Sequence, residues 1–123
     1  MEEEKWFQNP TVWIFIIVLA IAIWVVWPSG PGEYDTFASC ISESGAVIYG
    51  TEWCSHCKAQ KAMFGKSFDK ITFVDCDRQR DVCLLAGVEG YPTWKIGGEN
   101  YPGQQPLQTL AGLTGCELVK DGN

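Results

Sequence analysis

Residues 53–58 read WCSHCK, and what we expect of the rest of the chain follows from this stretch. The apolar run at 46–50, which glycines bound, precedes it and predicts a buried strand. The two cysteines therefore stand where a strand passes into a helix, with Cys54 at the helix N-terminus and Cys57 one turn later. There the helix dipole and free backbone N–H groups favour a thiolate, which is the nucleophile of disulfide exchange.

The spacing of this pair predicts separate roles for its members. We expect Cys54 to be the exposed, attacking sulfur and Cys57 to be the resolving sulfur. His56 can donate to the Cys54 thiolate or place positive charge near it, and Lys58 can help to lower the thiolate pKa. Because a stabilised thiolate makes the disulfide a stronger oxidant, the pattern favours donating disulfides over reducing them.

Strands and helices alternate around this pair. The pattern predicts an α/β fold with a partly parallel sheet that helices cover on both faces. The predicted helices are 34–42, 54 to about 65 or 68, 77–86 and one that starts at Pro106; the predicted strands are 46–50, 71–75, 93–96 and 99–101.

Residues 11–27 contain no charge and predict one transmembrane helix of about 26 Å. Tryptophans lie near both ends of this run, as at membrane interfaces. Lys5 on the N-terminal side predicts a cytoplasmic N-terminus, so the rest of this single-pass protein is expected outside the cytoplasm. A cleaved signal peptide is the alternative, which the acidic start of the chain disfavours. We divide the chain into a tail (1–10), this helix, a linker (28–33), one domain (34–119) and a frayed tail (120–123).

Composition excludes several functions. The formal net charge is -6, and lysine and arginine form no run, so nucleic acid is not an expected ligand. Six cysteines in 123 residues suggest disulfides, which persist outside the cytosol. A zinc site built on the active pair would need Cys76 and Cys83, but their spacing of seven does not fit the usual pattern. We expect no metal and no cofactor.

The stretch WCSHCK, with Gly90-Tyr91-Pro92-Thr93 further on, resembles the thioredoxin superfamily. The runs CSHCKAQKAMFG, VDCD, VCLLAGVEGYPTW and YPGQQPLQTLAGLTG resemble more closely the thioredoxin-like domain found with vitamin K epoxide reductase homologues. This resemblance implies a compact thioredoxin-like fold, a four-stranded mixed sheet with flanking helices. It also implies a cis peptide bond before Pro92, beside the active disulfide.

The same resemblance implies substrates and a partner. Domains of this kind exchange disulfides with secreted proteins and are reoxidised by a four-helix, quinone-reducing membrane enzyme. Here that partner is expected as a separate chain, a vitamin K epoxide reductase-like oxidase. One departure concerns Ile48, where many relatives carry a buried acid six residues before the first active cysteine. Proton transfer at Cys57 then needs another route, such as Glu52 or water.

The remaining cysteines leave alternatives open. Cys76 and Cys83 match paired cysteines of the resembled family, as a structural disulfide or as a second redox pair that relays electrons. Cys40 and Cys116 lie outside the family pattern and form a third disulfide, remain free thiols, or bridge two molecules.

Aromatic residues flank the active pair. Trp53 and Trp94 are expected to pack around it, and either can contact an extended substrate. Main-chain groups near Tyr91 can pair with such a substrate as an added strand.

The predicted function is a membrane-anchored thiol–disulfide oxidoreductase that passes disulfides to exported, cysteine-containing proteins through Cys54–Cys57. One alternative is a tethered reductase, for example in cytochrome c maturation. Another is a non-enzymatic module that binds a metal or a partner protein.

Overall fold

The computed structural model describes residues 5–27 and 30–122 and divides the chain into two compact units, 1–30 and 31–123. The boundary falls within the predicted linker. Residues 1–4, 28–29 and 123, which belong to the predicted tails and linker, lie outside the described residues.

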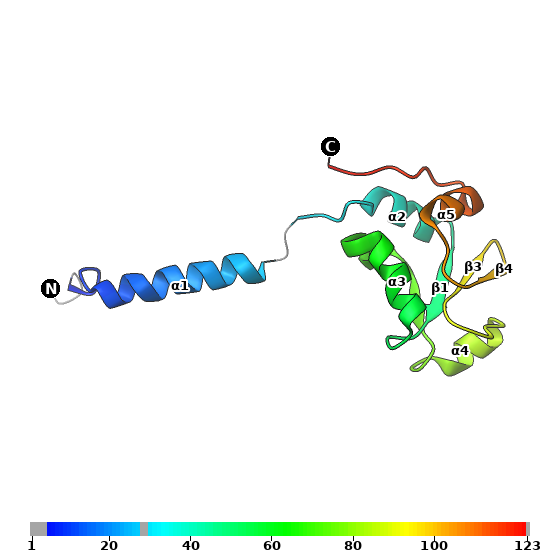
Figure 1. Ribbon diagram of the computed structural model, residues 1–123, viewed down its shortest axis with the longest axis horizontal. Coiled ribbons are helices and arrows are strands. Elements are labelled where there is room, and N and C mark those ends of the chain that lie inside the picture. The colour runs from blue at the N-terminus through cyan, green and yellow to red at the C-terminus, as the bar shows by residue number, and fades with distance from the viewer. Residues whose placement is uncertain (1–4, 28–29, 123) are drawn as a thin grey trace. The chain divides into compact units, whose positions relative to one another are not determined.

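The first unit is built around one helix, α1, Pro10–Val26 (Figure 1). Its start is set by Asn9, whose side chain accepts hydrogen bonds from the Thr11 backbone N–H (3.4 Å) and hydroxyl (2.9 Å). Pro10 occupies the first helical position, where a missing N–H costs nothing. The helix ends at Trp27, whose extended backbone suits the residue before a proline.

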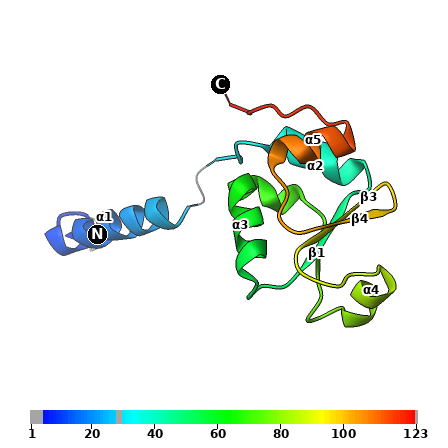
Figure 2. The same cartoon turned by 45° about the vertical axis from the view of Figure 1, so that its right-hand side comes forward.

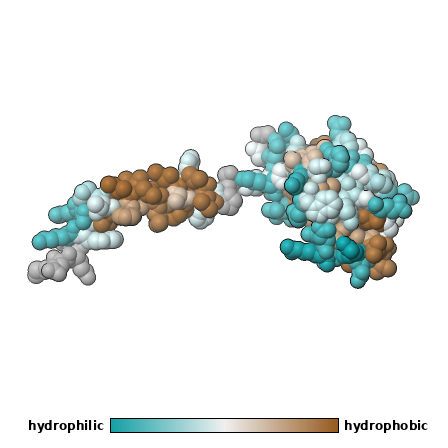
Figure 3. All heavy atoms as spheres, turned by 60° about the horizontal axis from the view of Figure 1, so that its bottom comes forward, coloured by the Kyte–Doolittle hydropathy of each residue, from teal (hydrophilic) through white to brown (hydrophobic). Residues whose placement is uncertain are grey.

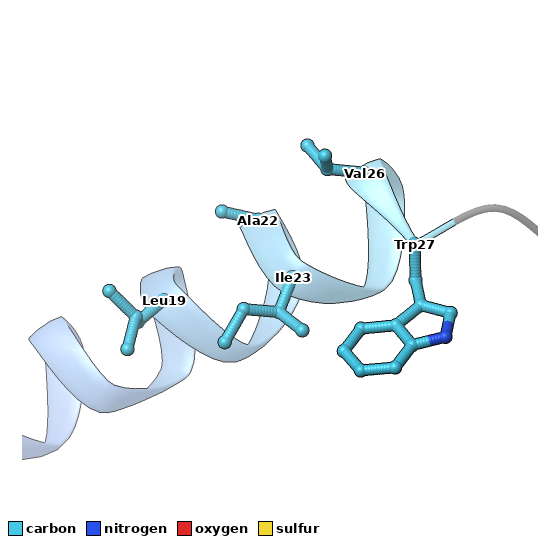
Figure 4. Close-up of a pocket in the computed structure, with 5 residues that line it drawn as sticks. All are labelled: Leu19, Ala22, Ile23, Val26 and Trp27. Carbon is cyan, nitrogen blue, oxygen red and sulfur yellow. The ribbon is translucent and has the colours of Figure 1, made fainter.

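The surface of α1 is apolar. None of its residues is buried within its own unit, and the space-filling view shows a continuous hydrophobic band along the visible face (Figure 3). Near its C-terminal end a shallow hollow is lined by Leu19, Ala22, Ile23, Val26 and Trp27, with the Trp27 ring turned back toward Ile23 (Figure 4). The hollow contains no group for redox chemistry.

The transmembrane helix that we predicted over 11–27 is not found. Within 5–27 and 30–122, no helix has both the length and the apolar character needed to cross a membrane. The 17 residues of α1 extend about 26 Å, whereas the hydrocarbon core is about 30 Å thick.

The second unit contains the predicted four-stranded mixed sheet, in the order β2-β1-β3-β4. β1 (Val47–Gly50) runs parallel to β2 (Phe73–Asp75) and antiparallel to β3 (Thr93–Ile96), which pairs antiparallel with β4 (Glu99–Pro102). The β1–β2 crossover passes through the helix that carries the active cysteines. This arrangement confirms the predicted fold class.

The helices are α2 (Asp35–Glu43), α3 (Ser55–Phe64), the 3-10 helix η2 (Gly65–Lys70), α4 (Arg80–Leu85) and α5 (Leu107–Thr114). α4 is shorter than the predicted helix 77–86. Asp75 is the reason. Its side chain accepts a hydrogen bond from the Asp77 N–H (2.9 Å), and its carbonyl accepts one from the Gln79 N–H (2.8 Å). These bonds form a turn in place of the first helical turn.

Alternating residues of the strands face two cores. Ile48, Trp94 and Ile96 face α2, α3 and α5, whose contributions include Phe37, Phe64 and Leu110. Tyr49 faces the opposite side and packs with Cys76 and Cys83 beside α4. Figures 1 and 2 show α2, α3 and α5 on one side of the sheet and α4 at the other, so both faces are covered as predicted.

We expected residues 120–123 to be frayed, but Lys120 and Asp121 are held by specific contacts. The Asp121 carboxylate accepts from the Thr36 N–H and hydroxyl, both at 2.7 Å, and these bonds hold the pKa of Asp121 below its ordinary value. Lys120 forms an ion pair with Glu33 at 3.1 Å. These contacts tie the segment to the start of α2.

Candidate active site

Cys54 is the N-cap of α3. Its sulfur accepts a hydrogen bond from the Cys57 backbone N–H at 3.2 Å, and its carbonyl accepts from the Lys58 N–H at 3.0 Å. The sulfur therefore lies at the positive end of the helix with an N–H donor directed at it. Cys54 is only 8% exposed, so the sulfur that we predicted to be exposed is nearly buried.

Cys57 lies behind it and is fully buried, at 0% exposure. Burial raises the pKa of its thiol to about 12, and the hydrogen bond to the Cys54 side chain adds to the rise. A backbone hydrogen bond from Thr51 and the positive charge of Lys61 both lower the pKa of Cys57, but by less than burial raises it. At neutral pH Cys57 is a protonated thiol. This geometry suits an attacking Cys54 and a resolving Cys57, the roles that we predicted.

Gly50 makes room for the buried sulfur. A Cβ atom built on Gly50 would lie 2.7 Å from the Cys57 sulfur, which is too close for a real contact, and 3.3 Å from a ring carbon of Phe73, which is tight. Only glycine allows β1 to pass this close to α3. In the sequence Gly50 stands out only as the boundary of a strand, although its place just before the cysteine pair is a usable signal.

The Tyr91–Pro92 peptide bond is cis. Pro92 is buried, and its carbonyl accepts from the Gly103 N–H at 2.7 Å. Tyr91 is partly exposed, and its ring meets the Trp53 ring edge to face, with centroids 6.2 Å apart. The segment that contains the cis bond therefore lies beside the Cys54 loop.

The two tryptophans differ. Trp53 is 65% exposed and its indole N–H donates to the Asp77 carboxylate at 2.7 Å, so it links the Cys54 loop to the segment around Cys76. Its free face can contact a substrate. Trp94 is completely buried and donates to the side-chain oxygen of Gln60 at 3.1 Å. The prediction that Trp94 can contact a substrate is wrong, because β3 turns it into the core.

Gln60 is a second residue that sequence reasoning missed. It is fully buried, yet its side chain is satisfied by the Trp94 indole and by both backbone groups of Gln105, at 2.7 and 3.0 Å. These bonds fix α3 against the segment that leads to α5. An apparently ordinary glutamine in a helix gave no signal of this role.

The charged residues that we singled out are exposed. His56 and Lys58 lie on the first turns of α3, and within the described residues neither side chain forms a hydrogen bond or ion pair. The role that we assigned to His56, favouring the donation of disulfides, stays a prediction. Glu52 pairs with Lys61 at 3.1 Å. Ile48 is fully buried in the core.

The other four cysteines form two disulfides, Cys40–Cys116 (S–S 2.08 Å) and Cys76–Cys83 (2.07 Å). The first pair forms because α2 and α5 pack on the same face of the sheet, so of the three alternatives for Cys40 and Cys116 the structure has the disulfide. Both sulfurs of the second pair belong to buried residues, which favours a structural role over an electron relay.

Chemically, the arrangement supports disulfide exchange. Among the described residues, no three His, Cys, Asp or Glu side chains cluster as a metal site would. A sulfur at the helix N-terminus and a completely buried sulfur one turn later, at a helix start that follows a central strand, define the site of a thiol–disulfide oxidoreductase.

Comparisons with known proteins agree with this class. Residues 32–114 match the thioredoxin family model, and the chain belongs to the thioredoxin family. It is 37% identical over 90 residues to the thiol-disulfide oxidoreductase LTO1 of Arabidopsis thaliana, covering 66% of this chain and 24% of that protein. It is 37% identical over 73 residues to the protein disulfide-isomerase of Aspergillus niger, covering 52% and 14%.

Among solved structures, the chain is similar to oxidised thioredoxin from Plasmodium falciparum. The sequences are 26% identical and the TM-score is 0.41, with 64% of this chain and 86% of that chain covered. The chain spans about a quarter or less of the length of the two curated relatives named above.

Proposed function

We propose that the protein passes disulfides to exported, cysteine-containing proteins through Cys54–Cys57, and that a vitamin K epoxide reductase-like membrane enzyme reoxidises it. The observation that carries the proposal is the asymmetry of the pair. Cys54 lies at a helix N-terminus with 8% exposure, whereas Cys57 is completely buried with a pKa of about 12. The partner is inferred from the sequence runs that resemble the thioredoxin-like domain of that system.

The exchange has two steps. A substrate thiolate attacks the Cys54 sulfur of the Cys54–Cys57 disulfide, and Cys57 leaves as a thiolate that takes up a proton. A second substrate thiolate then attacks the substrate sulfur of this mixed disulfide and releases the Cys54 thiolate. The substrate loses two electrons and the protein gains them; the membrane partner removes them again.

Two features favour oxidation over reduction. The Cys54 sulfur receives the Cys57 N–H at the positive end of α3, which stabilises the reduced form once Cys54 is a thiolate. Ile48 supplies no acid to deprotonate Cys57 from the core side. A reductase would need Cys57 to attack readily, and burial opposes this.

The reduction potential tests the direction. After equilibration with glutathione buffers, alkylation and mass spectrometry give the fraction of oxidised Cys54–Cys57. We expect a potential above roughly -200 mV, the range of disulfide donors. A value near roughly -270 mV, that of thioredoxin, would support the reductase instead.

The location is also a proposal. A helix that is apolar on all sides is normally covered by protein or lipid, and we propose that lipid covers α1. The second unit is proposed to lie outside the cytoplasm, where disulfides such as Cys40–Cys116 persist. Carbonate extraction of membranes should leave the full chain in the pellet, and a matched variant with Leu19→Lys and Ile23→Lys should be released.

External protease then tests the side of the membrane. Protease added to intact spheroplasts should digest the second unit. Digestion only after lysis would place that unit in the cytoplasm and contradict the proposal.

A further inference from the structure

Lys61 is a positively charged residue on the same helix as the active pair. It follows Cys57 by four residues in α3, so the two side chains lie on the same face of the helix. Its ammonium lies 3.1 Å from a Glu52 carboxylate oxygen and 4.2 Å from the centroid of the Phe73 ring. Its side chain is only 25% exposed. An ion pair and a ring together fix the position of the charge.

That position is next to the buried sulfur. A Cβ on Gly50 would contact both the Cys57 sulfur and the edge of the Phe73 ring, so sulfur and ring flank the same point. Lys61 lies over the face of that ring. Cys57 itself is completely buried, and a charge acts more strongly where water is excluded. In agreement, the Lys61 charge lowers the pKa of Cys57 against the larger effect of burial.

We propose that Lys61, held by Glu52 and Phe73, stabilises the Cys57 thiolate while disulfides are exchanged. The inference rests on the proposed function and deepens it, because it names the residue that offsets burial of the resolving sulfur. It assigns Glu52 the role of holding Lys61, in place of the proton-transfer role that the sequence suggested.

The charge acts in both directions of the reaction. When a substrate thiolate attacks Cys54, the Cys54–Cys57 bond breaks and Cys57 departs as a thiolate. In the reverse step the Cys57 proton goes to solvent, Cys57 attacks Cys54, and the substrate leaves as a thiolate that takes a proton from water. Negative charge is on the Cys57 sulfur in each transition state, so Lys61 affects the rate of each.

The expected change is kinetic. If Lys61→Met raises the Cys57 pKa by one unit, the thiolate population falls about tenfold, and the greater nucleophilicity of a more basic thiolate recovers about threefold. The net loss is about threefold in the rate of the resolving step. The reduction potential at pH 7 should not change, because Cys57 is a neutral thiol there with or without Lys61.

The experiment measures how fast Cys57 displaces glutathione from a mixed disulfide on Cys54. Reduced full-length protein reacts with oxidised glutathione, samples are quenched with acid, and mass spectrometry gives the rate at which the Cys54–glutathione disulfide becomes Cys54–Cys57. Lys61→Met keeps the stem that packs on Phe73 but removes the charge, and Lys61→Arg keeps the charge. Lys70→Met, at an exposed lysine of η2, removes the same charge elsewhere.

We expect Lys61→Met to resolve about threefold more slowly, with Lys61→Arg and Lys70→Met close to the original rate. An unchanged rate in Lys61→Met overturns the inference. Equal slowing in Lys61→Arg, or a shifted potential in Lys61→Met, also overturns it, because either result indicates a packing role. If the unsubstituted protein forms no glutathione adduct on Cys54, the proposed function itself fails.

Discussion

The contact between Gly50 and Cys57 makes a sharp prediction about stability. In Gly50→Ala the new methyl group would lie 2.7 Å from the Cys57 sulfur, and ordinary contact begins at 3.4 Å. Neither Gly50 nor Cys57 can move easily to relieve the contact. Gly50 is paired with β2 and its carbonyl accepts from the Cys76 N–H at 2.8 Å, while Cys57 is in the first turn of α3. Overpacking of this kind costs about 2 kcal/mol of unfolding free energy.

The same displacement should slow the chemistry. The Cys57 sulfur must move relative to Cys54, and a shift approaching 1 Å in a reacting group costs at least about tenfold in rate. Urea denaturation of the oxidised and reduced protein measures the first effect. The conversion of the Cys54–glutathione disulfide measures the second.

Gly112→Ala is the matched control. Gly112 is exposed in α5, and a Cβ there would meet nothing within 4 Å. Alanine should stabilise this helix by up to about 1 kcal/mol. If Gly50→Ala proves as stable as the original protein and resolves at the same rate, the close approach of β1 to α3 is not a constraint and the reasoning is refuted.

Three other outcomes follow from the structure. Replacing Cys40 and Cys116 by alanine should lower the unfolding free energy by about 4.5 kcal/mol in the chain-entropy model, measured by urea denaturation. Gln60→Leu should cost about 3 kcal/mol in the same assay, because the buried Trp94 indole N–H loses its acceptor. Between pH 8 and 10 the reduced protein should lose about 1.4 kcal/mol of unfolding free energy, because the pKa of the Cys57 thiol has its ordinary value of 9.0 in the unfolded chain but about 12 in the folded protein.

Each of these has a result that contradicts it. Removing the Cys76–Cys83 disulfide should cost only about 2.5 kcal/mol, so an equal or larger loss there would reject the loop-length argument. For Gln60→Leu, unchanged stability would mean that the buried bonds contribute nothing. The buried Cys57 thiol contributes its full stabilisation below pH 9, and this contribution is lost as the pH rises toward 12. The reduced Cys57→Ala protein should show no such loss. If its stability falls with pH as steeply as that of the unsubstituted protein, the buried thiol is not the cause.

Local signals allowed much of this fold to be predicted. The apolar strand before the cysteines and the helix after them depend on neighbouring residues, and the structure contains both. The predicted start of α4 is too early because Asp75 accepts hydrogen bonds from the backbone N–H groups of Asp77 and Gln79 and forms a turn there. A helical sequence pattern does not reveal such a turn.

The features that were missed depend on distant contacts. Gly50 matters because Cys57 approaches it from another element, and Gln60 because Trp94 and Gln105 meet it in the core. Cys40 is the clearest case. Its partner is 76 residues away, and only the packing of α2 beside α5 brings the two together.

The most direct test of the central claim is to trap the attacking sulfur. Oxidised glutathione or a disulfide-bonded peptide reacts with the reduced Cys57→Ala protein, and mass spectrometry maps the adduct. The account predicts a stable mixed disulfide on Cys54, and no adduct at Cys57 in the matched Cys54→Ala protein within the same time. A Cys54→Ala protein that is modified as fast as Cys57→Ala would contradict the assignment of Cys54 as the attacking sulfur and Cys57 as the resolving one.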